Sequence, residues 1–173
     1  MENDLLFYEK QKFTQWWVWL ILLLPTGIFI LSTLSEFIFG LQYGYKLSDT
    51  SELLFTTLLF GCIYIFFYLI KLETIIKADG IYVRFFPFHL RYKHYKWEVL
   101  SNMYIREYFA ITEYGGWGLR SGLFGKGSAY NVNGNKGLQL EFTNGKKLLI
   151  GTQKETELQT LLVELKQEKN KLL

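Results

Sequence analysis

Two long uncharged stretches near the N-terminus constrain the fold more than any other feature of the chain. Residues 16–35 read WWVWLILLLPTGIFILSTLS, and residues 53–70 read LLFTTLLFGCIYIFFYLI. A helix that crosses the hydrocarbon core of a membrane needs about 20 apolar residues, with about 17 as the lower limit. A chain of 173 residues could hardly bury two such helices on all sides. The sequence therefore predicts a two-helix transmembrane hairpin.

The charges that flank these stretches predict an orientation. The first stretch is longer than the about 7–15 residues of a signal-peptide core, and no small-residue cleavage site follows it. Lys10 and Lys12 precede the first stretch, Lys71 and Lys77 follow the second, and the connecting segment has Lys46 against three acidic residues. By the positive-inside rule, we expect a multi-pass protein of the cell (inner) membrane with both termini in the cytoplasm.

These boundaries divide the chain into five predicted parts. They are a cytoplasmic N-terminal segment at 1–15, transmembrane helices at 16–36 and 53–70, an extracytoplasmic loop at 37–52, and a cytoplasmic domain at 71–173.

The predicted cytoplasmic domain consists of short runs rich in β-branched and aromatic residues, separated by turn signals. The pairs Asp79-Gly80 and Asn144-Gly145 are typical of hairpin turns, and further strands are expected at 91–98, 99–109 and 128–132. Thr152 and Glu155 fit a capping box, and leucines at helical spacing then predict a helix at 153–170. The expected fold is a mainly β, pleckstrin-homology-like (PH-like) barrel or curved antiparallel sheet of six or seven strands, capped by the C-terminal α-helix.

Several segments resemble a known family. Two apolar helices precede ET-I-x-x-DGI-Y-VRF-PF and a W-E-x-[LI]-x-x-x-Y-[IV]-R segment. The residues that carry this pattern are Glu73, Thr74, Asp79, Gly80, Ile81, Tyr82, Trp97, Glu98, Tyr104 and Arg106. In this arrangement the chain resembles small, uncharacterised bacterial membrane proteins that carry a bacterial PH-like domain. The resemblance implies a PH-like fold and no particular chemistry.

The net positive charge of the chain is concentrated after residue 70. Residues 71–173 hold sixteen Lys or Arg against ten Asp or Glu, and a basic domain beside a bilayer is attracted to anionic lipid. Such cations also serve topology and solubility, so both interpretations stay open. The candidate lipid-surface contacts are Lys71, Lys77, Arg84, Arg91, Lys93 and Lys96.

A glycine-rich segment at 115–137 is the other candidate region. Neither the phosphate-binding G-x-x-x-x-G-K-[ST] pattern nor G-x-G-x-x-G is present, so the glycines are interpreted mainly as turn and bulge residues. The candidate contacts for a partner are Trp117, Arg120, Lys126, Tyr130 and Lys136.

Catalytic signatures are lacking in the sequence. One cysteine, Cys62, and two histidines, His89 and His94, exclude a Cys₄ or Cys₂His₂ metal site. No H-E-x-x-H, G-x-S-x-G or paired-carboxylate motif occurs. We expect no enzymatic activity, no cofactor, no metal and no nucleic-acid partner.

The function predicted from these features is a non-enzymatic, membrane-anchored adaptor or scaffold. Its PH-like domain would bind a protein, a peptide or another copy of itself, with a strand edge beside the helix suited to an extended peptide. One alternative is a module that binds anionic lipid. Another is an accessory subunit of a larger membrane complex, packed through its hairpin on a small-residue face. That face would consist of Thr56, Thr57, Gly61 and Cys62.

Overall fold

A computed structural model describes residues 5–39, 50–122 and 125–171 of the chain. It does not describe the side chains at 32–33, 35–39, 50–54 and 168–171. The chain divides into two compact units. Phe13–Leu69 forms one unit, and Met1–Lys12 together with Ile70–Leu173 forms the other. Most of the predicted loop at 37–52 lies outside the described residues.

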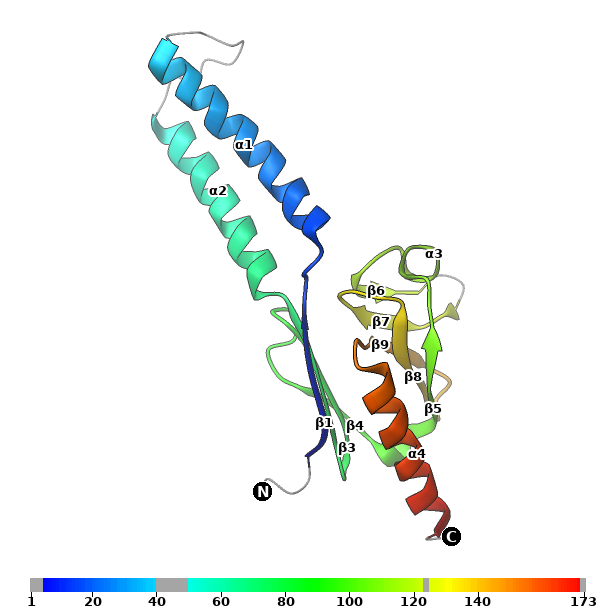
Figure 1. The fold of residues 1–173 in the computed structure, drawn as a ribbon. Coiled ribbons are helices and arrows are strands. Elements are labelled where there is room, and N and C mark those ends of the chain that lie inside the picture. The colour runs from blue at the N-terminus through cyan, green and yellow to red at the C-terminus, as the bar shows by residue number, and fades with distance from the viewer. Residues whose placement is uncertain (1–4, 40–49, 123–124, 172–173) are drawn as a thin grey trace. The chain divides into compact units, whose positions relative to one another are not determined.

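The unit Phe13–Leu69 contains two helices that lie side by side (Figure 1). They are α1 (Trp16–Phe39), which includes Pro25, and α2 (Thr50–Leu69). The Tyr64 hydroxyl of α2 donates a hydrogen bond to the Leu22 carbonyl oxygen of α1 at 2.9 Å, and it lies 3.1 Å from the Thr26 hydroxyl. A polar contact therefore joins the two helices amid their mainly apolar side chains.

The prediction of membrane-spanning helices is contradicted. Among the described residues, no helix combines the length and apolarity that a membrane crossing requires. This finding corrects the predicted transmembrane hairpin, the integral two-span membrane partnership and the multi-pass inner-membrane location.

The second unit begins with a strand that the sequence analysis did not predict. β1 (Leu5–Lys12) pairs antiparallel with β2 (Lys71–Lys77), which lies beyond both helices in the sequence. Phe7, Glu9 and Gln11 are buried on one face of β1, while the residues between them are exposed. This alternation is the period of a strand with one covered face.

β1 completes an antiparallel sheet of four strands in the order β1-β2-β3-β4. The other two strands are β3 (Gly80–Phe86) and β4 (Lys93–Lys96). The turn between β2 and β3 consists of Ala78 and Asp79, because Gly80 already pairs with Lys77. The predicted turn pair Asp79-Gly80 is therefore displaced by one residue.

A second sheet has five strands in the order β5-β8-β9-β7-β6. Its strands are β5 (Leu100–Glu107), β6 (Gly118–Ser121), β7 (Ser128–Asn131), β8 (Lys136–Phe142) and β9 (Lys147–Gly151). A short 3₁₀ helix, η1 (Trp97–Val99), joins β4 to β5. The remaining helices of the unit are α3 (Ala110–Tyr114) and α4 (Glu155–Lys171).

The predicted PH-like barrel is wrong. The described strands form two separate sheets, and β7 runs parallel to β9, whereas the prediction required antiparallel strands throughout. With four α-helices among the described residues, the fold is mixed α/β.

The two sheets bury a common core. Ring contacts connect them, because Tyr95 of β4 lies 5.3 Å from Phe142 of β8, and Phe85 of β3 lies 6.4 Å from Tyr130 of β7 between ring centroids. α4 contacts both β1 and β5, one strand from each sheet. The buried core residues of these elements include Leu72, Ile76, Ile81, Val83, Leu138, Leu140, Ile150, Leu158 and Leu162.

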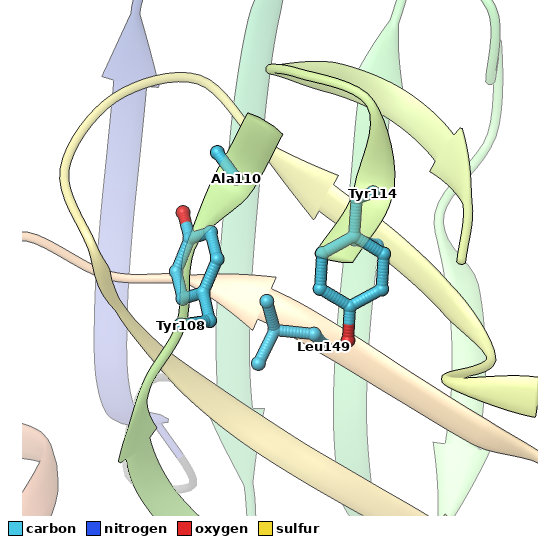
Figure 2. Close-up of a cluster of buried hydrophobic side chains, with 5 residues drawn as sticks. Tyr108, Ala110, Tyr114 and Leu149 are labelled. Carbon is cyan, nitrogen blue, oxygen red and sulfur yellow. The ribbon is translucent and has the colours of Figure 1, made fainter. Parts of the chain in front are cut away.

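A smaller cluster covers the other face of the second sheet. Tyr108 and Tyr114 flank Leu149 of β9 (Figure 2), and Ala110 and Ala129 complete the buried group. Leu148 and Ile150 are also buried, and successive side chains of a strand point to opposite faces. β9 is therefore covered on both faces.

Candidate functional site

A groove between β5 and α4 is the first candidate site. It encloses about 260 Å³. β5 is the last strand of its sheet among the described residues, so the edge opposite β8 has no strand neighbour there. The residues that line the groove are Met103, Tyr104, Ile105, Glu155, Gln159, Leu162, Val163 and Lys166.

The pairing of β5 with β8 fixes which backbone groups face the groove edge. The Tyr108 amide donates to the Asn135 carbonyl oxygen at 2.8 Å, in line with the register that pairs Arg106 with Gly137. Hydrogen-bonded and non-hydrogen-bonded pairs alternate along an antiparallel ladder. The amides of Arg106 and Tyr104 therefore point to β8, whereas those of Ile105 and Met103 point to the open edge.

The Asn102 side chain covers one of these edge amides. Its Oδ1 atom accepts a hydrogen bond from the Met103 amide at 2.9 Å. Such local side-chain bonds compete with strand pairing. A strand that adds to this edge must displace Asn102 before it can pair with Met103.

The helix side of the groove is apolar in the middle and charged at its ends. Leu162 is buried, but Val163 is 50% exposed. Glu155 forms an ion pair with Lys136 at 3.4 Å, and Lys166 lies one turn beyond Leu162. The groove thus offers an apolar contact beside a strand edge, with a cation at one end.

Arg106 fixes the end of β5. Its guanidinium donates to Gln139 at 2.9 Å and to the Tyr114 hydroxyl at 2.9 Å, and it pairs with the Glu113 carboxylate at 2.9 Å. Burial raises the pKa of Glu113, but the bonds from Arg106 and from the Phe109 amide outweigh this and hold the pKa below its usual value. The edge strand is therefore tied to α3 through a charged network.

The predicted lipid-surface residues do not act as one free basic surface. On one face of the four-stranded sheet, Glu73 accepts hydrogen bonds from Arg84 and from the Tyr92 hydroxyl at 2.9 Å, and it pairs with Lys71 at 3.0 Å. Burial raises the pKa of Glu73, but these bonds outweigh it and the net pKa is lowered. Two of the six candidate cations are therefore occupied by a buried carboxylate.

The other four candidate cations are divided between different places. Lys77 lies over the Tyr82 ring, with Nζ 5.5 Å from its centroid, while Arg91 and Lys96 are exposed. Lys93 instead donates to the Tyr130 hydroxyl at 3.0 Å. A residue predicted to contact lipid thus meets one predicted to contact a protein partner.

The remaining candidate partner residues are also separated. Arg120 donates to the Trp117 carbonyl oxygen at 3.0 Å, and Trp117 packs against the cluster in Figure 2. Lys126 lies 3.9 Å from Glu113, and Lys136 pairs with Glu155 beside α4. Among these, only Lys136 neighbours the groove.

The two histidines contribute to packing. His89 Nδ1 accepts a hydrogen bond from the Phe85 amide at 3.3 Å, and burial together with nearby Lys93 lowers its pKa. His94 stacks on Tyr82 with ring centroids 4.1 Å apart and lies 3.5 Å from the Asp79 carboxylate.

Sequence reasoning named an edge beside the helix but did not identify β5 as that edge. The pairing order decides which strand is terminal, and no local pattern in the sequence reports it. Comparison with known proteins gives no matching family model, no matching curated protein and no matching solved structure.

Proposed function

We propose that the chain is a non-enzymatic binding module that takes up an extended peptide in the β5–α4 groove. The single observation that supports this most is the open edge of β5 beside the partly exposed apolar surface of α4. Strand addition to such an edge supplies affinity through main-chain hydrogen bonds, and side-chain pockets supply specificity.

The groove suggests the kind of peptide. Every second side chain of an added strand points to the same face, so alternate apolar residues of the peptide would meet Leu162 and Val163. Lys166 favours an acidic residue at one end. The expected ligand is therefore an extended segment with alternating apolar residues and a neighbouring carboxylate.

A displayed library of random peptides, selected against the full chain, tests this proposal. Enriched peptides are then measured against Val163→Trp, which fills the groove, and against Val99→Trp, a control at an exposed valine outside it. We expect Val163→Trp to weaken binding by about tenfold or more, which is about 1.4 kcal/mol, and the control to leave it unchanged. Equal affinities for both variants would overturn the groove as the site.

Hydrogen exchange supplies an independent measurement. A peptide that pairs with the edge should slow exchange of the Ile105 amide, which points outward, while the Tyr104 amide is already bonded to β8. Binding without added protection at Ile105 would exclude main-chain pairing.

A further inference from the structure

We propose that a second cleft, bordered by β4, the start of β7 and the β8–β9 turn, binds a small molecule with an apolar, aromatic-sized body and one acidic group. The cleft encloses about 640 Å³. Sites for small organic ligands typically measure about 300–1,000 Å³ and are mainly apolar with a few polar groups. Its size thus suits a ligand of one or two rings.

Aromatic and aliphatic side chains form the walls. Tyr95 and Phe142 contact each other at 5.3 Å between ring centroids, and Val99 and Leu148 complete the apolar lining. Val99 is 41% exposed, so this wall is open to an incoming ligand. An apolar ring would cover surface that the fold leaves exposed.

Tyr130 gives the cleft a fixed polar point. It is only 6% exposed, and its hydroxyl accepts a hydrogen bond from Lys93 at 3.0 Å. The Lys93 ammonium also lies 5.4 Å from the Tyr130 ring centroid. Burial and the adjacent Tyr130 raise the pKa of Tyr95. The Tyr95 phenol therefore stays neutral at ordinary pH.

The charge of the lining favours an acidic ligand. Lys146 and Lys147 line the cleft, and no Asp or Glu is among its described lining residues. Lys147 pairs with Glu141 at 3.0 Å. Lys146 is exposed and has no ion pair with a described residue. Lys146 is thus the cation available to a carboxylate.

Gly127, in the glycine-rich segment, forms one border of the cleft where the chain passes close to Lys147 of β9. Gly127 has a φ of 85°, and a Cβ there would clash with the Lys147 carbonyl oxygen. Only glycine lets the chain pass so near β9 in this conformation. The close approach holds Ser128 and Tyr130 beside Lys147 in the lining.

Titration of the full chain with 2-naphthoate and with its uncharged analogue 2-naphthamide tests the proposal. Amide resonances of Gly127, Gly145 and Leu148 are followed by NMR. We expect saturable shifts with 2-naphthoate, and binding weaker by up to about fivefold with 2-naphthamide, because a partly exposed ion pair contributes up to about 1 kcal/mol.

Two pairs of variants locate the site. Val99→Trp fills the cleft and Lys146→Glu reverses its charge, whereas Val163→Trp and Lys166→Glu are matched changes at the β5–α4 groove. We expect only the first pair to weaken 2-naphthoate binding, by about fivefold. Absence of saturable shifts, equal binding of the two probes, or equal effects of both pairs would each overturn the proposal.

Discussion

Glu9 acts as a remote cap for α4. Its carboxylate accepts hydrogen bonds from the Thr152 hydroxyl at 2.7 Å and from the Gln153 amide at 2.7 Å, and the side chain is buried. The Thr152 hydroxyl in turn accepts a bond from the Lys154 amide at 3.1 Å. A carboxylate at a helix start also opposes the positive end of the helix dipole. An N-terminal residue thus stabilises the C-terminal helix.

Replacing Glu9 should therefore destabilise the start of α4. Hydrogen bonds to a charged group contribute about 1.5–3 kcal/mol, so we expect Glu9→Gln to lower the free energy of unfolding by about 2 kcal/mol. Urea denaturation measures the loss, and hydrogen exchange should be faster at the Leu158 amide, whose hydrogen bond to the Lys154 carbonyl oxygen begins α4. The control is Glu157→Gln, whose ion pair with Lys154 is exposed. Equal losses in both variants would refute a capping role.

Asn102 provides a single-residue test of peptide binding at the open edge of β5. Because its Oδ1 covers the Met103 amide, Asn102→Ala should free that donor for an added strand. One hydrogen bond contributes about 1 kcal/mol, so peptides selected for the groove should bind about fivefold more tightly. The control is Asn133→Ala, which removes a similar bond to the Gly134 amide. Unchanged affinity for Asn102→Ala would place peptide pairing away from Met103.

At the scale of elements, the four-stranded sheet should respond to acid through Glu73. The pKa of this group is lowered in the folded state by the bonds from Arg84, Lys71 and Tyr92. Its stabilising contribution is therefore complete above the ordinary value of 4.5 and is lost as the pH falls through the lower folded value.

We expect Glu73→Gln to be less stable than the unchanged chain near pH 7, by about 1–2 kcal/mol, and this difference to shrink below pH 4.5. Urea denaturation at several pH values measures it. Exposed Glu98 gives the control, Glu98→Gln, for which the difference should stay small throughout. A Glu73→Gln difference that persists at the lowest pH would show that packing, rather than charge, is responsible.

The local pattern predicted several elements closely. The alternation of Leu138 and Leu140 before the Asn144-Gly145 turn matches β8, and Leu158 and Leu162 are buried as an apolar stripe should be. Gln139 and Leu149 show where the pattern failed. The alternating pattern of a strand predicts that its second face is exposed to solvent, but α3 and the tyrosines around it cover that face. Burial there depends on a segment that the periodicity of the strand does not report.

At the scale of the whole molecule, the domain predicted from the sequence, 71–173, lacked one strand of the fold, and that strand is β1. LLFYEKQK precedes a long apolar helix and holds the charged residues Glu9, Lys10 and Lys12. Beside such a helix, these charges favour the interpretation of the segment as a charged flank. Its partner β2 lies beyond α2. Long-range pairing, rather than local composition, makes it a strand.

This arrangement predicts that residues 70–173 alone lack a stable fold. They would lose the pairing of β1 with β2, the buried Phe7 and the Glu9 cap, and the hydrogen bond from Gln11 to the Gly151 carbonyl oxygen. Gly-Ser linkage of residues 1–12 to 70–173 should restore the fold. Lys12 and Lys71 are register partners, and paired residues lie about 5 Å apart, so a short linker can replace Phe13–Leu69.

Amide NMR spectra of the two chains measure the difference. We expect well-dispersed resonances and cooperative unfolding for the linked chain, and poorly dispersed resonances for 70–173. Glu9→Gln in the linked chain should reproduce the loss of about 2 kcal/mol expected for the full chain, because Glu9 and its partners Thr152 and Gln153 are all kept in the linked chain. A stable, well-dispersed spectrum from 70–173 alone would mean that the two sheets assemble without their first strand.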